Sequence, residues 1–72
     1  MTELDLSGLK CPLPVLRTRK VLRTMRSGDR LSVICTDPLA AIDVPNLVRE
    51  TGDFLDDQRQ EDARLVFVIR KR

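Results

Sequence analysis

The fold of this chain is decided in the stretch Leu4-Asp5-Leu6-Ser7-Gly8-Leu9-Lys10-Cys11-Pro12-Leu13-Pro14. Residues 4–6 alternate apolar with polar side chains, which predicts a short β-strand that ends near Ser7-Gly8. From Cys11 onward, apolar residues recur at the spacing of a helix instead. Cys11 therefore lies where a strand gives way to a helix.

The helix that follows this junction has an apolar stripe. That stripe consists of Val15, Val21, Leu22 and Met25. Leu13 precedes a proline and is biased away from helical angles, so the helix should begin at Pro14. We expect it to end before Ser27-Gly28, where glycine suits a left-handed cap.

A second helix is predicted after Asp37-Pro38, because aspartate is a common helix cap and proline fits the first helical position. Pro45 conflicts with an uninterrupted helix, since a proline inside a helix clashes with the preceding turn. We therefore expect a short turn over residues 38–42. A main helix should follow, capped by Asp43 and closed by Gly52.

Three further stretches predict strands. Residues 31–35 alternate in the manner of a half-buried strand, residues 54–59 are polar and typical of a sheet edge, and residues 65–69 are the strongest apolar run. The order β-α-β-α-β-β predicts an α+β two-layer sandwich, in which a four-stranded mixed sheet carries two helices on one face. A right-handed crossover would make the first two strands parallel.

Length and composition predict one domain over residues 1–72, with 42% apolar and 33% charged residues. The longest apolar run, residues 65–69, is far shorter than the ~20 residues that span a bilayer, so we expect no membrane partner. The first residues include acids but no basic leader, so we expect no secretory signal and a cytoplasmic protein.

The chain has two cysteines and no histidine. Two cysteines can form at most one disulfide, whereas small extracellular domains usually carry several, so we expect free thiols. Without histidine, two cysteines cannot complete an ordinary zinc site, and neither Cys-His nor Ser-His catalysis is available. We expect no metal and no cofactor.

Cys11 is the candidate reactive group. Free backbone N–H groups at a helix start, together with the charge of Lys10, should lower the pKa of its thiol. Pro12 and Pro14 lack N–H groups, so the expected lowering is moderate, and they fix the backbone so that the thiol points outward. The alternative is an inert core cysteine, which the flanking lysine and proline disfavour.

The same stretch resembles the N-terminal motif of the TusA/SirA-type sulfur carriers, whose hallmark is Cys-Pro-x-Pro, here Cys11-Pro12-Leu13-Pro14. The resemblance continues over essentially the whole chain, through Gly28-Asp29, Asp37-Pro38, Val44-Pro45, Gly52 and Phe67-Val68-Ile69-Arg70-Lys71. Ser7 and Leu13 stand where arginine and glutamate are common in that family.

The resemblance implies the same fold and a chemistry of persulfide transfer. The cysteine that matches Cys11 would accept sulfur from a cysteine desulfurase or another sulfur donor. It would then pass the sulfur to a downstream acceptor protein in tRNA thiolation, cofactor synthesis or sulfur metabolism. Lys10, Pro12, Leu13 and Pro14 would support the motif around the thiol.

Cys35 has two interpretations. It shares a strand face with Leu31 and Val33, which indicates a packed core thiol. Parallel first and second strands would, however, bring it towards Cys11, where a resolving thiol would need Cα atoms within about 7 Å.

The basic residues of the first helix are candidates for partner docking. They are Arg17, Arg19, Lys20, Arg23 and Arg26. They form either a solvated face or a docking surface for acidic partners. The tail Arg70-Lys71-Arg72 could extend such a surface, but we expect it to fray in solvent. The rival function is a nucleic-acid-binding or regulatory module; it is disfavoured because the chain has no Trp or Tyr and only two Phe for base stacking.

Overall fold

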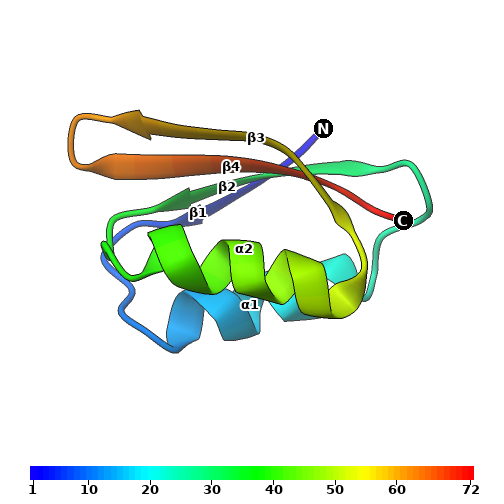
Figure 1. Cartoon of the computed structure of the whole chain (residues 1–72), viewed down its shortest axis with the longest axis horizontal. Coiled ribbons are helices and arrows are strands. Elements are labelled where there is room, and N and C mark those ends of the chain that lie inside the picture. Colours follow the sequence, from blue (N-terminus) through cyan, green and yellow to red (C-terminus); the bar gives the residue numbers. More distant parts are fainter.

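The computed structural model describes residues 1–72 as two layers, a sheet and a pair of helices (Figure 1). The elements are β1 (Thr2–Leu6), α1 (Leu13–Leu22), β2 (Arg30–Cys35), α2 (Ala40–Thr51), β3 (Phe54–Glu61) and β4 (Arg64–Arg70). Both helices lie on one face of the sheet. The predicted element order and the α+β two-layer sandwich are confirmed. Neither helix is long and apolar enough to cross a membrane.

The sheet is mixed, with strand order β1-β2-β4-β3. β1 runs parallel to β2, as expected from a right-handed crossover, and the other two pairs are antiparallel. Leu6 at the end of β1 pairs with Cys35 at the end of β2. The segments that leave these two strands therefore start side by side at one edge of the molecule.

The core lies between the helices and the central strands β2 and β4. Leu31, Val33 and Cys35 of β2 are completely buried, as is Phe67 of β4. They pack in one cluster with Leu22, Val44 and Leu47 of the two helices. The alternation that predicted β2 thus places its apolar side chains against the helical layer.

The expected break before Pro45 is wrong, because α2 continues from Ala40 to Thr51 with Pro45 inside it. A proline inside a helix removes one backbone hydrogen bond and crowds the preceding turn. Val44 and Leu47, on either side of it, are buried in the core, and this burial favours an unbroken helix. Asp43 is consequently a residue of the first turn and not a cap. The predicted end at Gly52 is confirmed, with φ of 80°.

The bounds of α1 also differ from the prediction. The helix begins at Leu13, one residue earlier than expected, and Pro12 is its N-cap residue. Pro14 is accommodated because the first turn does not need its N–H. The helix ends at Leu22, so Met25 packs against the core from the loop that leads to Gly28, where φ is 90°.

β3 is an edge strand, as predicted, but it extends to Glu61. The turn to β4 is tight, and Asp62 adopts φ of 56° within it. A bulge between Leu55 and Asp57 interrupts the pairing of β3 with β4. Charged side chains line this edge, which discourages pairing with another chain.

Candidate functional site

Cys11 is exposed in the turn between β1 and α1, immediately before the N-cap residue Pro12. The peptide bond between these two residues is cis. The alternative of a buried core cysteine is therefore wrong, since the residue is exposed to solvent. A thiol in this position can be reached by a group on another molecule.

Asp37 anchors the main chain of Cys11. Its Oδ2 accepts the N–H of Cys11 at 2.6 Å, and its Oδ1 accepts the N–H of Leu39 at 3.0 Å. These two hydrogen bonds, first the one from Cys11, lower the pKa of Asp37, and the charge of Lys10 acts in the same direction. The carboxylate thus caps the turn that leads into α2, as expected, and also ties the cysteine turn to it.

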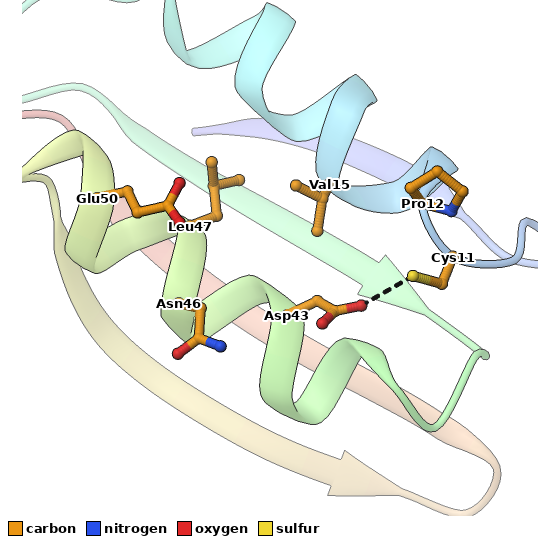
Figure 2. A pocket seen from close by; sticks show the side chains of 7 residues that line it. All are labelled: Cys11, Pro12, Val15, Asp43, Asn46, Leu47 and Glu50. Carbon is orange, nitrogen blue, oxygen red and sulfur yellow. Dashed lines mark hydrogen bonds between the residues drawn. The ribbon is translucent and has the colours of Figure 1, made fainter.

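Asp43 faces the sulfur itself. The Sγ of Cys11 donates to Oδ2 of Asp43 at 3.1 Å (Figure 2). This hydrogen bond, then desolvation, then the negative charges of Asp43 and Asp37 raise the pKa of the Cys11 thiol.

The expected lowering of the Cys11 pKa is therefore wrong. The N–H of Leu13 donates to the carbonyl of Lys10 at 2.9 Å, and Pro12 and Pro14 have no N–H to offer. The helix start thus provides no hydrogen bond to the sulfur, while two carboxylates lie close to it. The charge of Lys10 lowers the pKa of Asp37 instead.

A groove of about 290 Å³ opens beside Cys11, between α1 and α2 (Figure 2). It is lined by Cys11, Pro12, Val15, Asp43, Asn46, Leu47 and Glu50. Of its two acids, Asp43 contacts the thiol, whereas Glu50 is paired with Arg19 at 3.0 Å. No group of three or more histidine, cysteine, aspartate or glutamate side chains is arranged to hold a metal ion.

The family model described as "Sulfurtransferase TusA" matches residues 2–71. The chain belongs to the TusA family. A relative from Allochromatium vinosum, named "Sulfur carrier protein TusA", is 45% identical over 69 residues, which are 96% of this chain and 91% of that protein. A relative from Neisseria meningitidis, named as a putative sulfur carrier protein, is 44% identical over 92% of this chain and 89% of its own length.

A solved structure supports the same fold. The crystal structure of a SirA-like protein from Desulfitobacterium hafniense superposes with a TM-score of 0.87 and covers 97% of this chain and 96% of that one. The two sequences are only 21% identical, so this likeness concerns the architecture alone. The SirA-like protein thus has the same two-layer sandwich as this chain.

The residues that flank Cys11 in the motif differ in how exposed they are. Lys10 is exposed, and Leu13 is 44% exposed although it is apolar. Pro14, in the first turn of α1, is buried. The motif therefore combines an anchored helix start with apolar surface next to the thiol.

The basic residues predicted for the first helix do not all lie in α1, because Arg23 is its C-cap residue and Arg26 lies in the loop that follows. Arg17, Lys20, Arg23 and Arg26 are exposed, whereas Arg19 reaches across to Glu50 on the groove side. Arg17 and Lys20 border a separate hollow of about 560 Å³. Its other lining residues are Leu4, Leu13, Leu16 and Val21. The basic residues within α1 are thus divided between the groove beside Cys11 and this second hollow.

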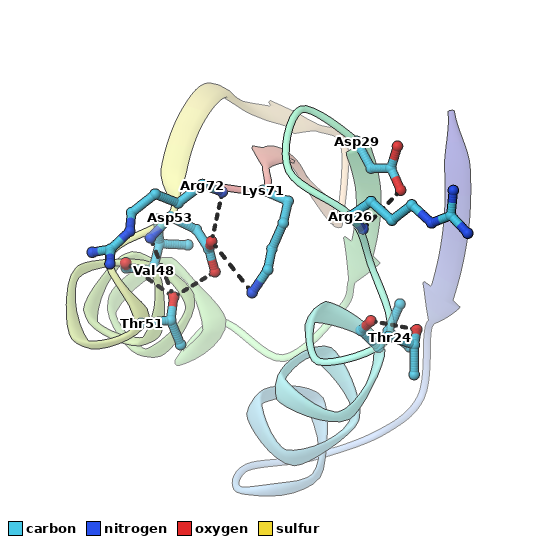
Figure 3. A network of polar contacts seen from close by, with 9 residues as sticks. Thr24, Arg26, Asp29, Val48, Thr51, Asp53, Lys71 and Arg72 are labelled. Carbon is cyan, nitrogen blue, oxygen red and sulfur yellow. Dashed lines mark hydrogen bonds and ion pairs between the residues drawn. The ribbon is translucent and has the colours of Figure 1, made fainter.

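The expected fraying of the basic tail is wrong. Lys71 exchanges two backbone hydrogen bonds with the loop before β2, one with Gly28 at 2.9 Å and one with Asp29 at 2.7 Å. The N–H of Arg72 donates to the buried carboxylate of Asp53 at 2.9 Å (Figure 3). These contacts hold the tail against the loop before β2 and beside the C-terminal end of α2.

Cys35 is a core residue, as its strand position indicated. It is 0% exposed, and burial, with a further contribution from the charge of Asp37, raises the pKa of its thiol to about 11. Both observations weigh against a resolving role, because such a thiol must ionise and meet the sulfur on Cys11.

The sequence interpretation missed Asp43 as a neighbour of the thiol. A signal was present: parallel β1 and β2 must bring whatever follows them to the same edge, and Asp37 and Asp43 follow β2. The assumed break at Pro45 made Asp43 a helix cap and concealed this possibility. An acid one turn into a continuous α2 can instead face the cysteine turn.

Proposed function

We propose that this chain is a sulfur carrier, which accepts sulfur as a persulfide on Cys11 and relays it to an acceptor protein. The observation that carries the proposal is an exposed thiol on an anchored turn, beside a groove. Membership of the TusA family and the names of the two relatives support it. The shallow site encloses no substrate, which suits a protein that presents its group to partners.

The transfer needs no external oxidant or reductant. In loading, the sulfur of Cys11 attacks the outer sulfur of a persulfide on the donor. A new S–S bond forms on Cys11, the S–S bond of the donor breaks, and the donor cysteine leaves as a thiol. In unloading, a thiol of the acceptor attacks the outer sulfur in turn, and Cys11 is released as a thiol.

The partners follow from this chemistry. The donor is a cysteine desulfurase or another protein that carries a persulfide, and the acceptor presents a thiol in tRNA thiolation, cofactor synthesis or sulfur metabolism. A thiol that must stay reduced between transfers fits a reducing compartment, so we place the protein in the cytoplasm.

Mass spectrometry tests the proposal. The purified chain is incubated with a cysteine desulfurase and cysteine, and we expect a mass increase of one sulfur atom that a reductant removes. Cys11→Ser should abolish the adduct, whereas Cys35→Ser should keep it. No adduct under conditions that load a TusA-family carrier, or an adduct that survives in Cys11→Ser, would contradict the proposal.

The structure offers little to the rival function of nucleic-acid binding. Phe67 is fully buried in the core, and Phe54 lies under the guanidinium of Arg70, 4.4 Å from ring centroid to Cζ. Phe67 therefore cannot stack on a base, and Arg70 covers one face of the Phe54 ring. We therefore propose only the carrier function.

A further inference from the structure

We propose that Asp43 is the proton acceptor and donor for sulfur transfer at Cys11. This inference rests on the carrier function proposed above and adds a second catalytic residue to it. Asp43 lies 32 residues from Cys11 in sequence, and its Oδ2 is 3.1 Å from the reacting sulfur. It is a half-buried residue in the first turn of α2.

The position of Asp43 relative to the sulfur is fixed by the backbone. Asp37 holds the N–H of Cys11 at 2.6 Å and the N–H of Leu39 at 3.0 Å. The carbonyl of Leu39 in turn accepts the N–H of Asp43 at 2.9 Å. A short chain of hydrogen bonds therefore joins the main chain of the cysteine to the residue that faces its side chain.

Sulfur transfer needs such a group because the thiol holds its proton in this site. The pKa of Cys11 is raised, mainly by its hydrogen bond to Asp43, so the thiol is mostly protonated at neutral pH. The protonated thiol is the weak nucleophile, and the chain has no histidine to take its proton.

The other charged groups near the thiol do not fill this role. Asp37 uses both carboxylate oxygens on backbone N–H groups, and Glu50 in the groove is paired with Arg19 at 3.0 Å. Lys10 is a donor and cannot accept a proton in its charged state. Asp43 is the carboxylate that the thiol already contacts.

The proposed step is balanced in atoms and charge. As Sγ of Cys11 attacks the outer sulfur of the donor persulfide, its proton moves to Oδ2 of Asp43. The S–S bond of the donor breaks, and the thiolate that leaves takes the proton from Asp43. The net change is Cys11–SH plus donor–S–SH to Cys11–S–SH plus donor–SH, with no change in the total oxidation state.

A purely restraining role for Asp43 makes the opposite prediction. If the carboxylate only held the thiol protonated, its removal would create more thiolate and accelerate every reaction of Cys11. If it also relays the proton, removal accelerates alkylation, whose leaving group is iodide and needs no proton, and slows sulfur transfer. The sign of the effect in the two assays therefore separates the roles.

The test compares wild type, Asp43→Asn, Asp43→Glu and the control Glu3→Gln, which removes an exposed carboxylate on β1. Two rates are measured on each: alkylation of Cys11 by iodoacetamide against pH, and loading from a cysteine desulfurase with cysteine, both read by mass spectrometry. Thermal melts followed by circular dichroism show that each variant is folded.

We expect Asp43→Asn to move the pH midpoint of alkylation down and to slow loading by roughly 100-fold, the lower end of the range for a positioned acid–base group. Asp43→Glu should recover part of the loading rate, and Glu3→Gln should behave as wild type. Loading of Asp43→Asn at or above the wild-type rate would overturn the inference while leaving the carrier function intact. Failure of the wild type to load would instead overturn the carrier function.

Discussion

The two ends of α2 carry aspartates with opposite surroundings. At the C-terminal end the side chain of Asp53 is completely buried, and it accepts hydrogen bonds from Arg72 N–H at 2.9 Å and from the Thr51 hydroxyl at 2.7 Å. At the N-terminal end Asp43 is half-buried and accepts one hydrogen bond, from the sulfur of Cys11. A carboxylate with all its partners inside the protein stabilises the fold, whereas one that faces an exposed thiol is available for chemistry.

The pKa of Asp53 illustrates the difference. Burial opposes its ionisation, but the hydrogen bonds from Arg72 and Thr51 and the charges of Lys71 and Arg72 prevail and lower the pKa. Lys71 Nζ lies 3.7 Å from Oδ1 of Asp53 (Figure 3). Substitutions at the two aspartates should therefore differ most in their effect on the free energy of unfolding.

Asp53→Ala should reduce the free energy of unfolding by about 1–3 kcal/mol, because the backbone N–H of Arg72 and the hydroxyl of Thr51 lose a buried acceptor. Urea denaturation at neutral pH measures this loss. Glu61→Ala, which removes an exposed acid from the edge strand β3, is the control and should change stability by less than about 0.5 kcal/mol. Equal effects of the two substitutions would contradict the stabilising role of Asp53.

The contribution of Asp53 should also disappear in acid. Because its pKa is lower in the folded chain than in the unfolded chain, its stabilisation is complete above the unfolded value of about 3.9. The stabilisation is lost as the pH falls through the lowered folded value. The difference in stability between wild type and Asp53→Asn should therefore shrink between pH 5 and about pH 2, and a constant difference would oppose this explanation.

Gly52→Ala should cost about 1–2 kcal/mol, because residue 52 has φ of 80°, which an L side chain rarely adopts. A Cβ there would also come within 2.7 Å of Nη1 of Arg72, but this flexible tip can move aside. Gly8→Ala, with φ of 83° and open space around it, provides a matched control for backbone strain alone. Thermal melts should show similar losses for both; a much larger loss at Gly52 would mean that Arg72 does not move.

Asp43→Asn should have the smallest effect on stability, about 0.3–1 kcal/mol, from a weaker interaction with the start of α2. Urea denaturation of this variant beside Asp53→Asn compares the two ends of one helix directly. A loss at Asp43 as large as that at Asp53 would show that both acids are structural, and would weaken the contrast from which the proton-relay role is argued.

Much of the fold could be predicted from the sequence, because each strand and helix leaves a local pattern. Alternation located β2, the apolar run at residues 65–69 located β4, and Gly52 located the end of α2. The break expected at Pro45 was wrong, since the burial of Val44 and Leu47 is a tertiary effect that a local rule about proline does not include. The tail at Arg72 was misjudged for the same reason, because its partner Asp53 lies 19 residues earlier.

The site could be predicted only in part. The exposure of Cys11 followed from its place between a strand and a helix, and the family resemblance from the motif around it. The direction of its pKa shift did not follow, because Asp37 and Asp43 lie 26 and 32 residues away in sequence. Local helix-start effects were outweighed by carboxylates that only the folded chain brings to the sulfur.

Asp37 accepts the backbone N–H of Cys11, whereas the sulfur of Cys11 is hydrogen-bonded to a different residue, Asp43. An additional atom on Sγ would replace the hydrogen that is donated to Asp43, but the hydrogen bond from the N–H of Cys11 to Asp37 does not involve the sulfur. We therefore expect the main chain of this turn to have the same conformation whether or not Cys11 carries an additional sulfur. A partner protein that distinguishes the two forms would then have to contact the additional sulfur itself, because the backbone of the turn would be the same in both.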